Sequence, residues 1–557
     1  MDNYAIADNF SLLSKLMDIH GENSFKTKSY SSAAFTIEKL PAELSSIPEE
    51  KIFSVKGIGD AIGKKIIEQL HTGELSLLNE YISKTPAGIM EMLTIKGIGP
   101  KKISVIWKEL EIENPGELLY ACNENRLLLY KGFGEKTQQN IKDAIEFYLN
   151  NIGSYLYAQM EVYAKEADTK IKDAFPLQQF HLAGDFRRHL ETIDKLEWVT
   201  TTTNQEIINF FLQQEYKIIN ANETETQLKG KENLLLIFYH SPHEKFFTTL
   251  FEKSCSERFL KAWKNKFLLH ETYSSEEDIF IKAGIDFIEP YLRETEQIIF
   301  KAEKHQLPFV IQTGDITSII HSHSKWSDGV NTIEEMTVAA IEKRLQYLVL
   351  SDHSKSAFYA QGLYEEKIIA QHKEIDELNA KYAPFKIFKS IESDILNDGK
   401  LDYSNEVLNS FDIVIASVHS NLKMKEDKAM MRLVTAIENP YTSILGHPTG
   451  RLLLGRNGYP VDHKKIIDAC AANNVAIELN AHPKRLDIDW RWIDYCLEKN
   501  VLISIDPDAH SINGYNDIQY GVLAAQKAGV TKENNLSSFS LAAFEEFLKV
   551  QHAKRPL

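Results

Sequence analysis

The chain has 557 residues, of which 43% are hydrophobic and 25% are charged, and its formal net charge is −16. This length predicts three to five domains, because a single hydrophobic core rarely grows beyond roughly 250 residues. We find neither an apolar run near the roughly 18 residues that span a bilayer nor a signal peptide, so we expect a cytoplasmic protein without a membrane partner. The four cysteines form no Cys-x-x-Cys pair, which argues against disulfides and against a cysteine zinc site.

The first 150 residues contain three similar segments: VKGIGDAIGKKIIEQL from Val55, IKGIGPKKISVIWKEL from Ile95 and YKGFGEKTQQNIKDAI from Tyr130. In each, a Lys-Gly-x-Gly turn precedes an amphipathic helix, and such a turn points several backbone N–H groups at one phosphate. One copy is equally well explained as a tight turn between packed helices, but three copies favour contact with a DNA backbone despite the negative net charge. The expected DNA-binding residues are Lys56, Gly57, Gly59, Lys96, Gly97, Gly99, Lys101, Lys131, Gly132 and Gly134.

These repeats resemble helix-hairpin-helix modules. The preceding segment FKTKSYSSAAFTIEKLP, together with the first hairpin, resembles the N-terminal lyase domain of family X DNA polymerases, the DNA polymerase beta type. In that family a lysine after the hairpin attacks an abasic sugar, and Lys65 falls at the matching position. The alternative for Lys65 is an ordinary solvated or phosphate-binding lysine, because a nucleophilic role requires a depressed pKa.

The stretch AGDFRRHLETIDKLEWV, residues 183 to 199, resembles the palm of family X polymerases. The family pattern is Gly-Ser-x-Arg-Arg, then Asp-x-Asp on one strand and a third aspartate on a neighbouring strand. These three carboxylates hold the two magnesium ions of nucleotidyl transfer. The residues that match the pattern are Gly184, Arg187 and Arg188. The residues that depart from it are Asp185 in place of the serine, and Lys195 and Glu197 in place of the first two aspartates.

The expected third aspartate falls in NLLLIFYHSP, residues 233 to 242, which contains no carboxylate. Shifting the register by one residue brings in Asp194, but its partner two residues later is then Leu196. Lys195 also places a positive charge where a metal would sit. We therefore expect no Mg²⁺ in the palm and no templated polymerisation. The segment EEDIFIKAGIDFIEPYLRE, from residue 276, resembles one that precedes the last domain of bacterial family X proteins, which indicates an inherited palm with a lost metal site.

The last 240 residues alternate strand-like runs with amphipathic helices: YLVLS, FKIFKSIE, FDIVIAS, TSILGH, VAIELN and VLISID. This pattern predicts parallel βαβ units that close into a barrel. Histidines and carboxylates follow successive strands, so they converge on one rim, where such folds carry their active sites. The nine candidate metal ligands are His321, His323, Asp328, His353, Glu392, His419, His447, Asp508 and His510. Mixed nitrogen and oxygen ligands suit manganese or zinc, with iron as a third candidate, and nine ligands predict two to three ions.

These motifs, in this order, resemble the PHP (polymerase and histidinol phosphatase) domain, which implies a distorted (β/α)₇ barrel with a trinuclear centre. The resemblance assigns the nine residues as ligands, with Asp328 placed less securely because that spacing varies in the family. We expect Asp352, Glu478 and His482 to orient ligands rather than to bind metal. Arg451, four residues after His447, is a candidate for binding a substrate phosphate, with a structural salt bridge as the equal alternative.

Over essentially its full length the chain resembles bacterial family X DNA polymerases with a C-terminal PHP domain. The fold expected is multidomain α+β: helix-hairpin-helix regions, a polymerase beta-like nucleotidyltransferase palm and thumb, and a PHP barrel. The expected domains are a lyase-like region with the first hairpin (1–82), a fingers-like helix-hairpin-helix domain (83–150), a degenerate palm (151–232), a thumb-like domain (233–300), a linker (301–318) and the PHP domain (319–557).

In that family the PHP domain acts as a manganese-dependent 3′–5′ exonuclease, with 3′-end cleaning and abasic-site cleavage also attributed to it. The resemblance therefore implies a DNA repair enzyme that binds gapped, nicked or 3′-recessed DNA, works as a monomer at the bacterial nucleoid and processes 3′ ends. Three alternatives stay open: an active gap-filling polymerase using Glu197 and an unrecognised carboxylate, a small-molecule phosphatase, and a non-enzymatic repair scaffold.

Overall fold

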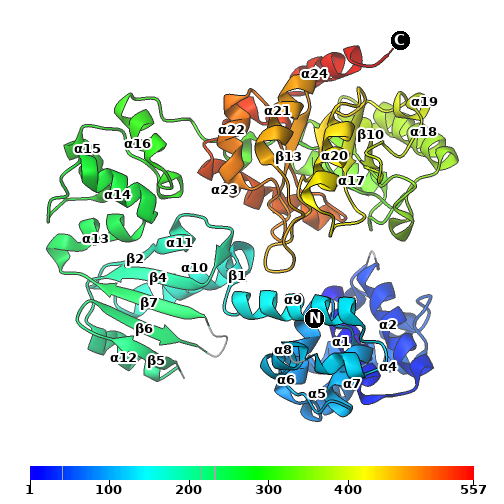
Figure 1. The fold of residues 1–557 in the computed structure, drawn as a ribbon, viewed down its shortest axis with the longest axis horizontal. Coiled ribbons are helices and arrows are strands. Elements are labelled where there is room, and N and C mark those ends of the chain that lie inside the picture. Colours follow the sequence, from blue (N-terminus) through cyan, green and yellow to red (C-terminus); the bar gives the residue numbers. More distant parts are fainter. Residues whose placement is uncertain (41, 124, 215, 231–233, 557) are drawn as a thin grey trace. The chain divides into compact units, whose positions relative to one another are not determined.

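The computed structural model describes residues 1–40, 42–123, 125–214, 216–230 and 234–556. The chain forms two compact units, Met1–Ile152 and Gly153–Leu557 (Figure 1). Within the described residues, no helix combines the length and the apolarity needed to cross a membrane.

The N-terminal unit is helical. Its helices are α1 Asn3–His20, α2 Ser24–Glu38, α3 Glu49–Ile52, α4 Asp60–Thr72, α5 Ser76–Ser83, α6 Ala87–Thr94, α7 Pro100–Lys108, α8 Pro115–Asn123 and α9 Glu135–Asn151. In α1 the Asp2 side chain caps the start by accepting a hydrogen bond from the Ala5 N–H, and Gly21 ends the helix in a left-handed conformation. The unit has two hydrophobic clusters, one drawn from Ile6 to Tyr81 and one mostly from Ile89 to Ile145.

The C-terminal unit begins with a mixed sheet in the strand order β2-β4-β7-β6-β5. Its elements, with the small β1–β3 pair, are β1 Tyr155–Leu156, α10 Tyr157–Ala174, β2 Phe180–Ala183, α11 Gly184–Arg187, β3 Thr192–Ile193, β4 Lys195–Thr200, α12 Asn204–Leu212, β5 Lys217–Ala221, β6 Glu225–Lys229 and β7 Leu235–His240. Strand β7 pairs in parallel with β4, the strand that begins at Lys195. The palm-like sheet therefore continues through β7, and the predicted palm–thumb boundary at 232/233 is corrected. Residues 231–233 themselves lie outside the described residues.

Four helices follow the sheet: α13 Phe246–Lys253, α14 Glu257–Lys266, α15 Glu276–Ala283 and α16 Glu296–Glu303. They enclose an aromatic core in which the Trp263 ring lies 4.8 Å from Phe251 and 5.0 Å from Phe280. The Arg293 side chain is fully buried in this core, where Glu276 provides its ion-pair partner. This segment therefore has its own core within the C-terminal unit.

The remaining residues form a seven-stranded, all-parallel sheet in sequence order, β14 to β8. The strands are β8 Ser318–Ile319, β9 Tyr347–Leu350, β10 Lys386–Asp394, β11 Ile413–Ser417, β12 Ile444–Leu445, β13 Ala476–Asn480 and β14 Ile503–Asp506. A parallel bridge between Ser322, after β8, and Ala509, after β14, brings the two edges together. The sheet is thus the nearly closed seven-stranded barrel that we expected from the sequence. Only β8, which has two residues, was not among the six strand-like runs identified in the sequence.

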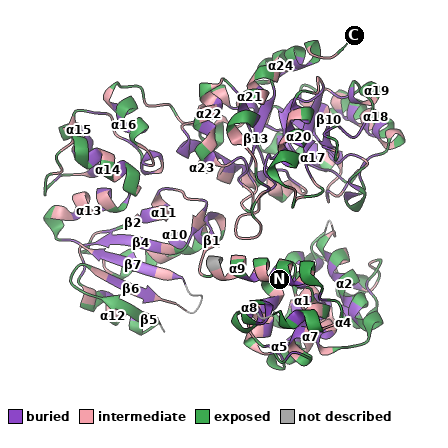
Figure 2. Ribbon diagram, in the orientation of Figure 1, coloured by how far each residue is buried: buried purple, intermediate pink, exposed green. Residues whose placement is uncertain are grey.

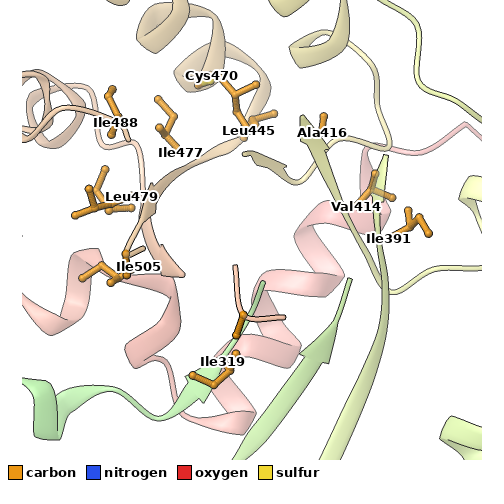
Figure 3. Close-up of a cluster of buried hydrophobic side chains, with 14 of the residues drawn as sticks. Ile319, Ile391, Val414, Ala416, Leu445, Cys470, Ile477, Leu479, Ile488 and Ile505 are labelled. Carbon is orange, nitrogen blue, oxygen red and sulfur yellow. The ribbon is translucent and has the colours of Figure 1, made fainter. Parts of the chain in front are cut away.

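Helices surround the barrel: α17 Ile333–Glu342, α18 Glu365–Tyr382, α19 Asn405–Leu408, α20 Glu426–Ile437, α21 His463–Asn473, α22 Ile493–Glu498, α23 Ile518–Lys527 and α24 Leu541–Ala553. The strands are buried on both faces, whereas the helices expose one side (Figure 2). Outward-facing strand residues such as Ile391, Val414, Ile477 and Ile505 pack beneath the helices (Figure 3).

Alternate residues of the strands face the barrel interior. Tyr347, Phe388 and Ile415 form one cluster there with Phe544 and Leu548 of α24, whose packing closes the end of the barrel where the strands begin. At the opposite end the same inward register changes from apolar to polar, for example from Phe388 to Glu392 along β10. The inward-facing apolar side chains at the beginnings of the strands therefore form a core, and the polar side chains at the ends of the strands are available for chemistry.

Candidate metal centre

The nine predicted ligands lie at the carboxyl ends of the barrel strands or in the loops that follow them, and the structure brings them together in one cluster that is mostly buried, with His510 and Asp328 partly exposed. Three groups have ligand atoms within 4.8 Å of one another: His323, Asp328, His353 and His510; His321, His323 and Asp508; His353, Glu392 and His419. The ninth, His447, lies beside the third group, with its Nε2 2.9 Å from Glu392 Oε1. Among the described residues, these are the groups of three or more potential metal ligands.

Glu392 lies near the carboxyl end of β10 and contacts several of the other predicted ligands. Its Oε2 is 2.8 Å from His353 Nδ1, and its Oε1 is 3.0 Å from His419 Nε2. The side chain has no exposed surface, and the imidazoles of His419, His321 and His353 outweigh burial and hold its pKa well below the usual range. The carboxylate is therefore ionised and available to bridge cations.

His323 connects two of the groups. Its ring stacks 4.3 Å from that of His353 and 4.2 Å from that of His510, and its Nε2 is 2.9 Å from Asp508 Oδ1. Burial, with smaller contributions from His510 and His353, lowers the pKa of His323 to about 3. The ring is therefore neutral and has a lone pair to offer to a metal.

Buried polar atoms without a hydrogen-bond partner show that the cluster fits metal ions. Among the described residues, they include Nε2 of His321, Nδ1 of His323 and Nδ1 of His447. A buried polar atom without a partner costs free energy, and cations placed between these atoms would satisfy them. The donor set of imidazole and carboxylate is the one that manganese, zinc and iron accept.

Two ligands are held in an uncommon backbone conformation: φ is 50° at His447 and 51° at Asp508. Residues other than glycine rarely adopt positive φ, and such strain gathers at functional sites. At Gly446, before His447, a side chain would collide with Ser417 Oγ. The backbone is thus shaped to aim these two side chains into the cluster.

Further carboxylates orient the ligands from outside the three groups. Glu478 Oε1 is 2.7 Å from His321 Nδ1, which turns Nε2 of that ring toward the cluster. Asp352 accepts hydrogen bonds from the Ser324 and Ser327 hydroxyls and so holds the loop that carries His323 and Asp328.

Sequence reasoning missed a third orienting carboxylate. Asp394 Oδ1, at the end of β10, lies 3.0 Å from His419 Nδ1. Asp394 follows Glu392 by two residues on β10, so both side chains lie on the same face of the strand, and this spacing could have predicted its role. For His482, also predicted to orient a ligand, the ring Nδ1 accepts a hydrogen bond from the Lys484 N–H.

Arg451 is fully engaged in structural contacts. Its guanidinium pairs with Glu191 and Asp489 and donates to the carbonyl oxygens of Arg485 and Leu486. This is the salt-bridge alternative that the sequence left open. The cation at the cluster is instead Arg485, whose Nε is 3.7 Å from Asp508 Oδ2.

The palm-like sheet carries the predicted residues of the degenerate polymerase site, arranged as an internal network. Lys195 Nζ lies 3.1 Å from Glu197 Oε1, to which the Tyr239 hydroxyl also donates at 2.8 Å. A side chain at Gly184 would collide with the Glu197 carboxylate. Glu197, in the place of the second aspartate, is therefore neutralised by Lys195, in the place of the first.

The two palm arginines are engaged as well. Arg187 pairs with Glu276 at 2.6 Å, and Arg188 pairs with Asp185 and, at 2.9 Å, with Glu294. Their guanidinium groups thus serve internal ion pairs.

In the N-terminal unit, helices α4, α7 and α9 each begin directly after a Gly-x-Gly turn, and no side chain caps them. The residue between the glycines is buried in each turn (Ile58, Ile98 and Phe133), while the predicted DNA-binding lysines and glycines are exposed. The first glycine of each turn has φ between 93° and 100°, which an L side chain rarely adopts. Lys65 is half-buried on α4, and its lyase role stays a prediction.

Comparison with known proteins agrees with this geometry. A helix-hairpin-helix domain model matches residues 1–75, a SAM-like helix-hairpin-helix tandem model matches 89–146, and a PHP domain model matches 320–482. The DNA polymerase/3'-5' exonuclease PolX of Bacillus subtilis is 32% identical over 96% of this chain and 97% of its own length. The chain belongs to the PolX family.

Other relatives match part of the chain. A probable phosphatase of Thermoanaerobacter sp. (strain X514) is 27% identical over 42% of this chain and 95% of its own length. A probable phosphatase of Caldanaerobacter subterraneus is 31% identical over 29% of this chain and 60% of its own length. The protein is therefore a DNA-binding, metal-dependent enzyme of the PolX family that shares sequence with shorter phosphatase-like proteins.

Proposed function

We propose that this PolX-family member is a 3′–5′ exonuclease that works in DNA repair, with its chemistry in the barrel and no polymerase activity in the palm. The observation that carries the proposal is the contrast between two sites. In the barrel, Glu392 lies among the eight other predicted ligands, whereas in the palm Lys195 neutralises Glu197. The hairpin turns of the N-terminal unit hold gapped, nicked or 3′-recessed DNA by its backbone.

In this proposal the nine ligands hold two or three ions of manganese, zinc or iron, which supply Lewis acidity for activating water and stabilising phosphoryl charge. The protein contributes ionised carboxylates at Glu392 and Asp508, whose pKa values are held well below the usual range, and neutral imidazole at His323. Arg485 meets a non-bridging phosphate oxygen from the rim. Hydrolysis releases a nucleotide and leaves a new 3′ hydroxyl. Ends that carry a 3′ phosphate and abasic sites present the same phosphoester chemistry, and we include them as further substrates.

Small-molecule phosphatase activity is the second candidate, favoured by the likeness of the barrel to probable phosphatases. The three exposed hairpin turns in the same chain weigh against it, because a small substrate needs no DNA-binding unit. Inositol phosphates and phosphorylated amino alcohols, assayed alongside DNA, distinguish the two.

The deciding experiment combines the purified full chain with Mn²⁺, a 5′-labelled primer on a gapped template and all four dNTPs. We expect primer shortening that disappears in His353→Ala and persists in His305→Ala, because His305 is an exposed histidine paired with Asp286. Lengthening of the primer by any of these proteins would show that the palm polymerises. Persistent shortening in His353→Ala would place the nuclease elsewhere.

A further inference from the structure

Two large aromatic side chains are exposed on the loop that follows the predicted ligand His353. Phe358 is 81% exposed and Tyr359 is 62% exposed, and both lie in the short 3₁₀ helix Phe358–Ala360. The two ring centroids are 6.2 Å apart, and the Tyr359 ring lies 6.4 Å from the His353 ring. The pair therefore stands on the rim of the metal centre.

The backbone of this loop is held from within. Ala357 and Ala360, which flank the aromatic pair, are buried. The Leu363 N–H donates to the His353 carbonyl, and the Gly362 N–H donates to the Ala357 carbonyl. At Gly362 a side chain would collide with the Ser354 carbonyl, so the loop closes tightly on itself.

The loop is also held by the segment after β10. The Lys355 N–H donates to the Tyr403 hydroxyl at 3.1 Å, and the Ser356 N–H donates to Asp402 at 2.6 Å. The two alanines of the loop are thus buried, whereas its two aromatic side chains are exposed. This is an ordered presentation of aromatic surface, which the protein maintains although burying these rings would stabilise the fold.

Single exposed aromatic residues are common on protein surfaces and need no explanation. Here two adjacent rings lie beside a cluster that suits phosphoester hydrolysis, and on DNA the group attached next to each phosphate is a nucleoside with a flat base. Exposed aromatic rings on a positioned loop bind unpaired bases by stacking, and they tolerate any base because every base has a π-face.

We propose that Phe358 and Tyr359 form a stacking platform for the unpaired bases at the 3′ end of a DNA strand whose phosphodiester enters the metal centre. The proposal deepens the proposed function and rests on it. It names the preferred substrate as a strand whose terminal bases are unpaired, because a base within a duplex stacks on its neighbours and cannot reach the platform. A fully paired 3′ end must first fray.

The test uses the full chain with Phe358→Ala and Tyr359→Ala combined, and with Tyr359→Phe, which keeps the ring. The matched control is Phe309→Ala, which removes a 97% exposed phenylalanine from the segment before the barrel. Two 5′-labelled single strands are compared, one ordinary and one whose last two nucleotides lack bases.

We expect the double variant to lose about 10- to 100-fold in kcat/KM on the ordinary strand, mainly through KM. Wild-type enzyme should lose a similar factor on the baseless strand, and the double variant should lose nothing further there, because the two changes remove the same contact. Tyr359→Phe and the control should resemble wild type. Equal rates for the double variant and wild type on the ordinary strand, or fully additive losses, would overturn the platform.

A binding measurement separates this proposal from the proposed function. A single strand with 2-aminopurine as its 3′-terminal base and phosphorothioate linkages is titrated with the same proteins, and stacking is followed as a change in fluorescence. A change with wild type that is absent in the double variant supports the platform even where no cleavage is observed. Cleavage without any such change would uphold the nuclease and refute the platform.

Discussion

The contacts of single side chains distinguish a structural arginine from a candidate for phosphate binding, as Arg451 and Arg485 show. Arg451 follows the predicted ligand His447 by four residues, and Arg485 follows His482, which was predicted to orient a ligand, by three. The N–H groups of Arg451 donate to Glu191, Asp489 and backbone carbonyl oxygens. Arg485, by contrast, has its Nε 3.7 Å from Asp508 Oδ2, and 23% of its side chain is exposed. A partly exposed guanidinium at the rim is suited to a phosphoryl group.

Arg485→Ala should therefore lower kcat on DNA about 100-fold with little change in the unfolding temperature, as expected when one donor to a developing charge is removed. Arg485→Lys should restore part of the rate. Arg451→Ala should give the opposite pattern, a lower unfolding temperature from the loss of buried ion pairs. Steady-state kinetics with thermal unfolding of the same samples checks both. Loss of activity at unchanged stability in Arg451→Ala would reverse the assignment.

Glu276 predicts a pH dependence of stability. Burial alone would raise its pKa, but ion pairs with Arg293 and Arg187 outweigh burial and lower the pKa to about 2. The unfolded chain titrates near pH 4.3, so the stabilisation is fully present above that value and is lost as the pH falls toward 2. Its size follows from the shift and is roughly 3 kcal/mol.

Glu276→Gln should reduce the free energy of unfolding by about that amount at pH 7, and the difference from wild type should narrow at pH 3. Urea unfolding, followed by tryptophan fluorescence, to which Trp263 of the same helical core contributes, measures it. A difference that stays constant from pH 7 to pH 3 would show that the carboxylate is not responsible.

At the scale of elements, the three hairpin turns present glycine backbone to solvent while the residue between the glycines anchors each turn in the core. Gly97 has φ of 100° and no atom within 4 Å of the place a side chain would occupy. Backbone conformation, and not space, is therefore what requires glycine there.

Gly97→Ala should strain the turn by about 1–2 kcal/mol and weaken binding of a gapped duplex several-fold. Fluorescence anisotropy at two salt concentrations measures the affinity, and Gly314→Ala, at an open position without positive φ, is the control. Unchanged affinity in Gly97→Ala would argue that this turn does not contact DNA.

Across the C-terminal unit, contacts join the palm-like sheet to the barrel. Glu191 next to β3 is buried and pairs with Arg451 and Arg491 of the barrel. From α23, the fully buried Lys527 donates to the Arg188 carbonyl, next to α11 of the palm-like domain, at 2.7 Å. The degenerate palm thus has a structural role, because its charges satisfy buried charges of the barrel.

Glu191→Ala should destabilise the unit by roughly 3 kcal/mol, since it leaves the largely buried Arg451 short of a partner. Glu334→Ala, which breaks an exposed ion pair with Lys381, should change stability by less than about 1 kcal/mol. Thermal unfolding of the full chain compares them. Equal shifts in the two variants would mean that the palm–barrel contact contributes little.

The sequence alone determined the parts of this protein that depend on local pattern. Turn-and-helix repeats marked the hairpins, strand-like runs marked six of the seven barrel strands, and histidines and acids after successive strands marked the nine candidate ligands. Closure of a parallel barrel brings the ends of all its strands to one rim, so residues at those ends can be predicted to meet without knowledge of the distances between them.

Tertiary structure decided what depends on partners distant in the chain. Arg451 and Arg485 look alike in sequence, and the Glu191 carboxylate, 260 residues before Arg451, separates their roles. Strand β7 pairs in parallel with β4, as the expected place of the third aspartate in residues 233–242 indicated, and this pairing shows that the palm-like sheet extends beyond residue 232. The contact of Asp394 with His419 and the exposure of Phe358 and Tyr359 beside His353 are seen only in the folded chain, because burial, ion pairing and exposure depend on residues that are distant in sequence.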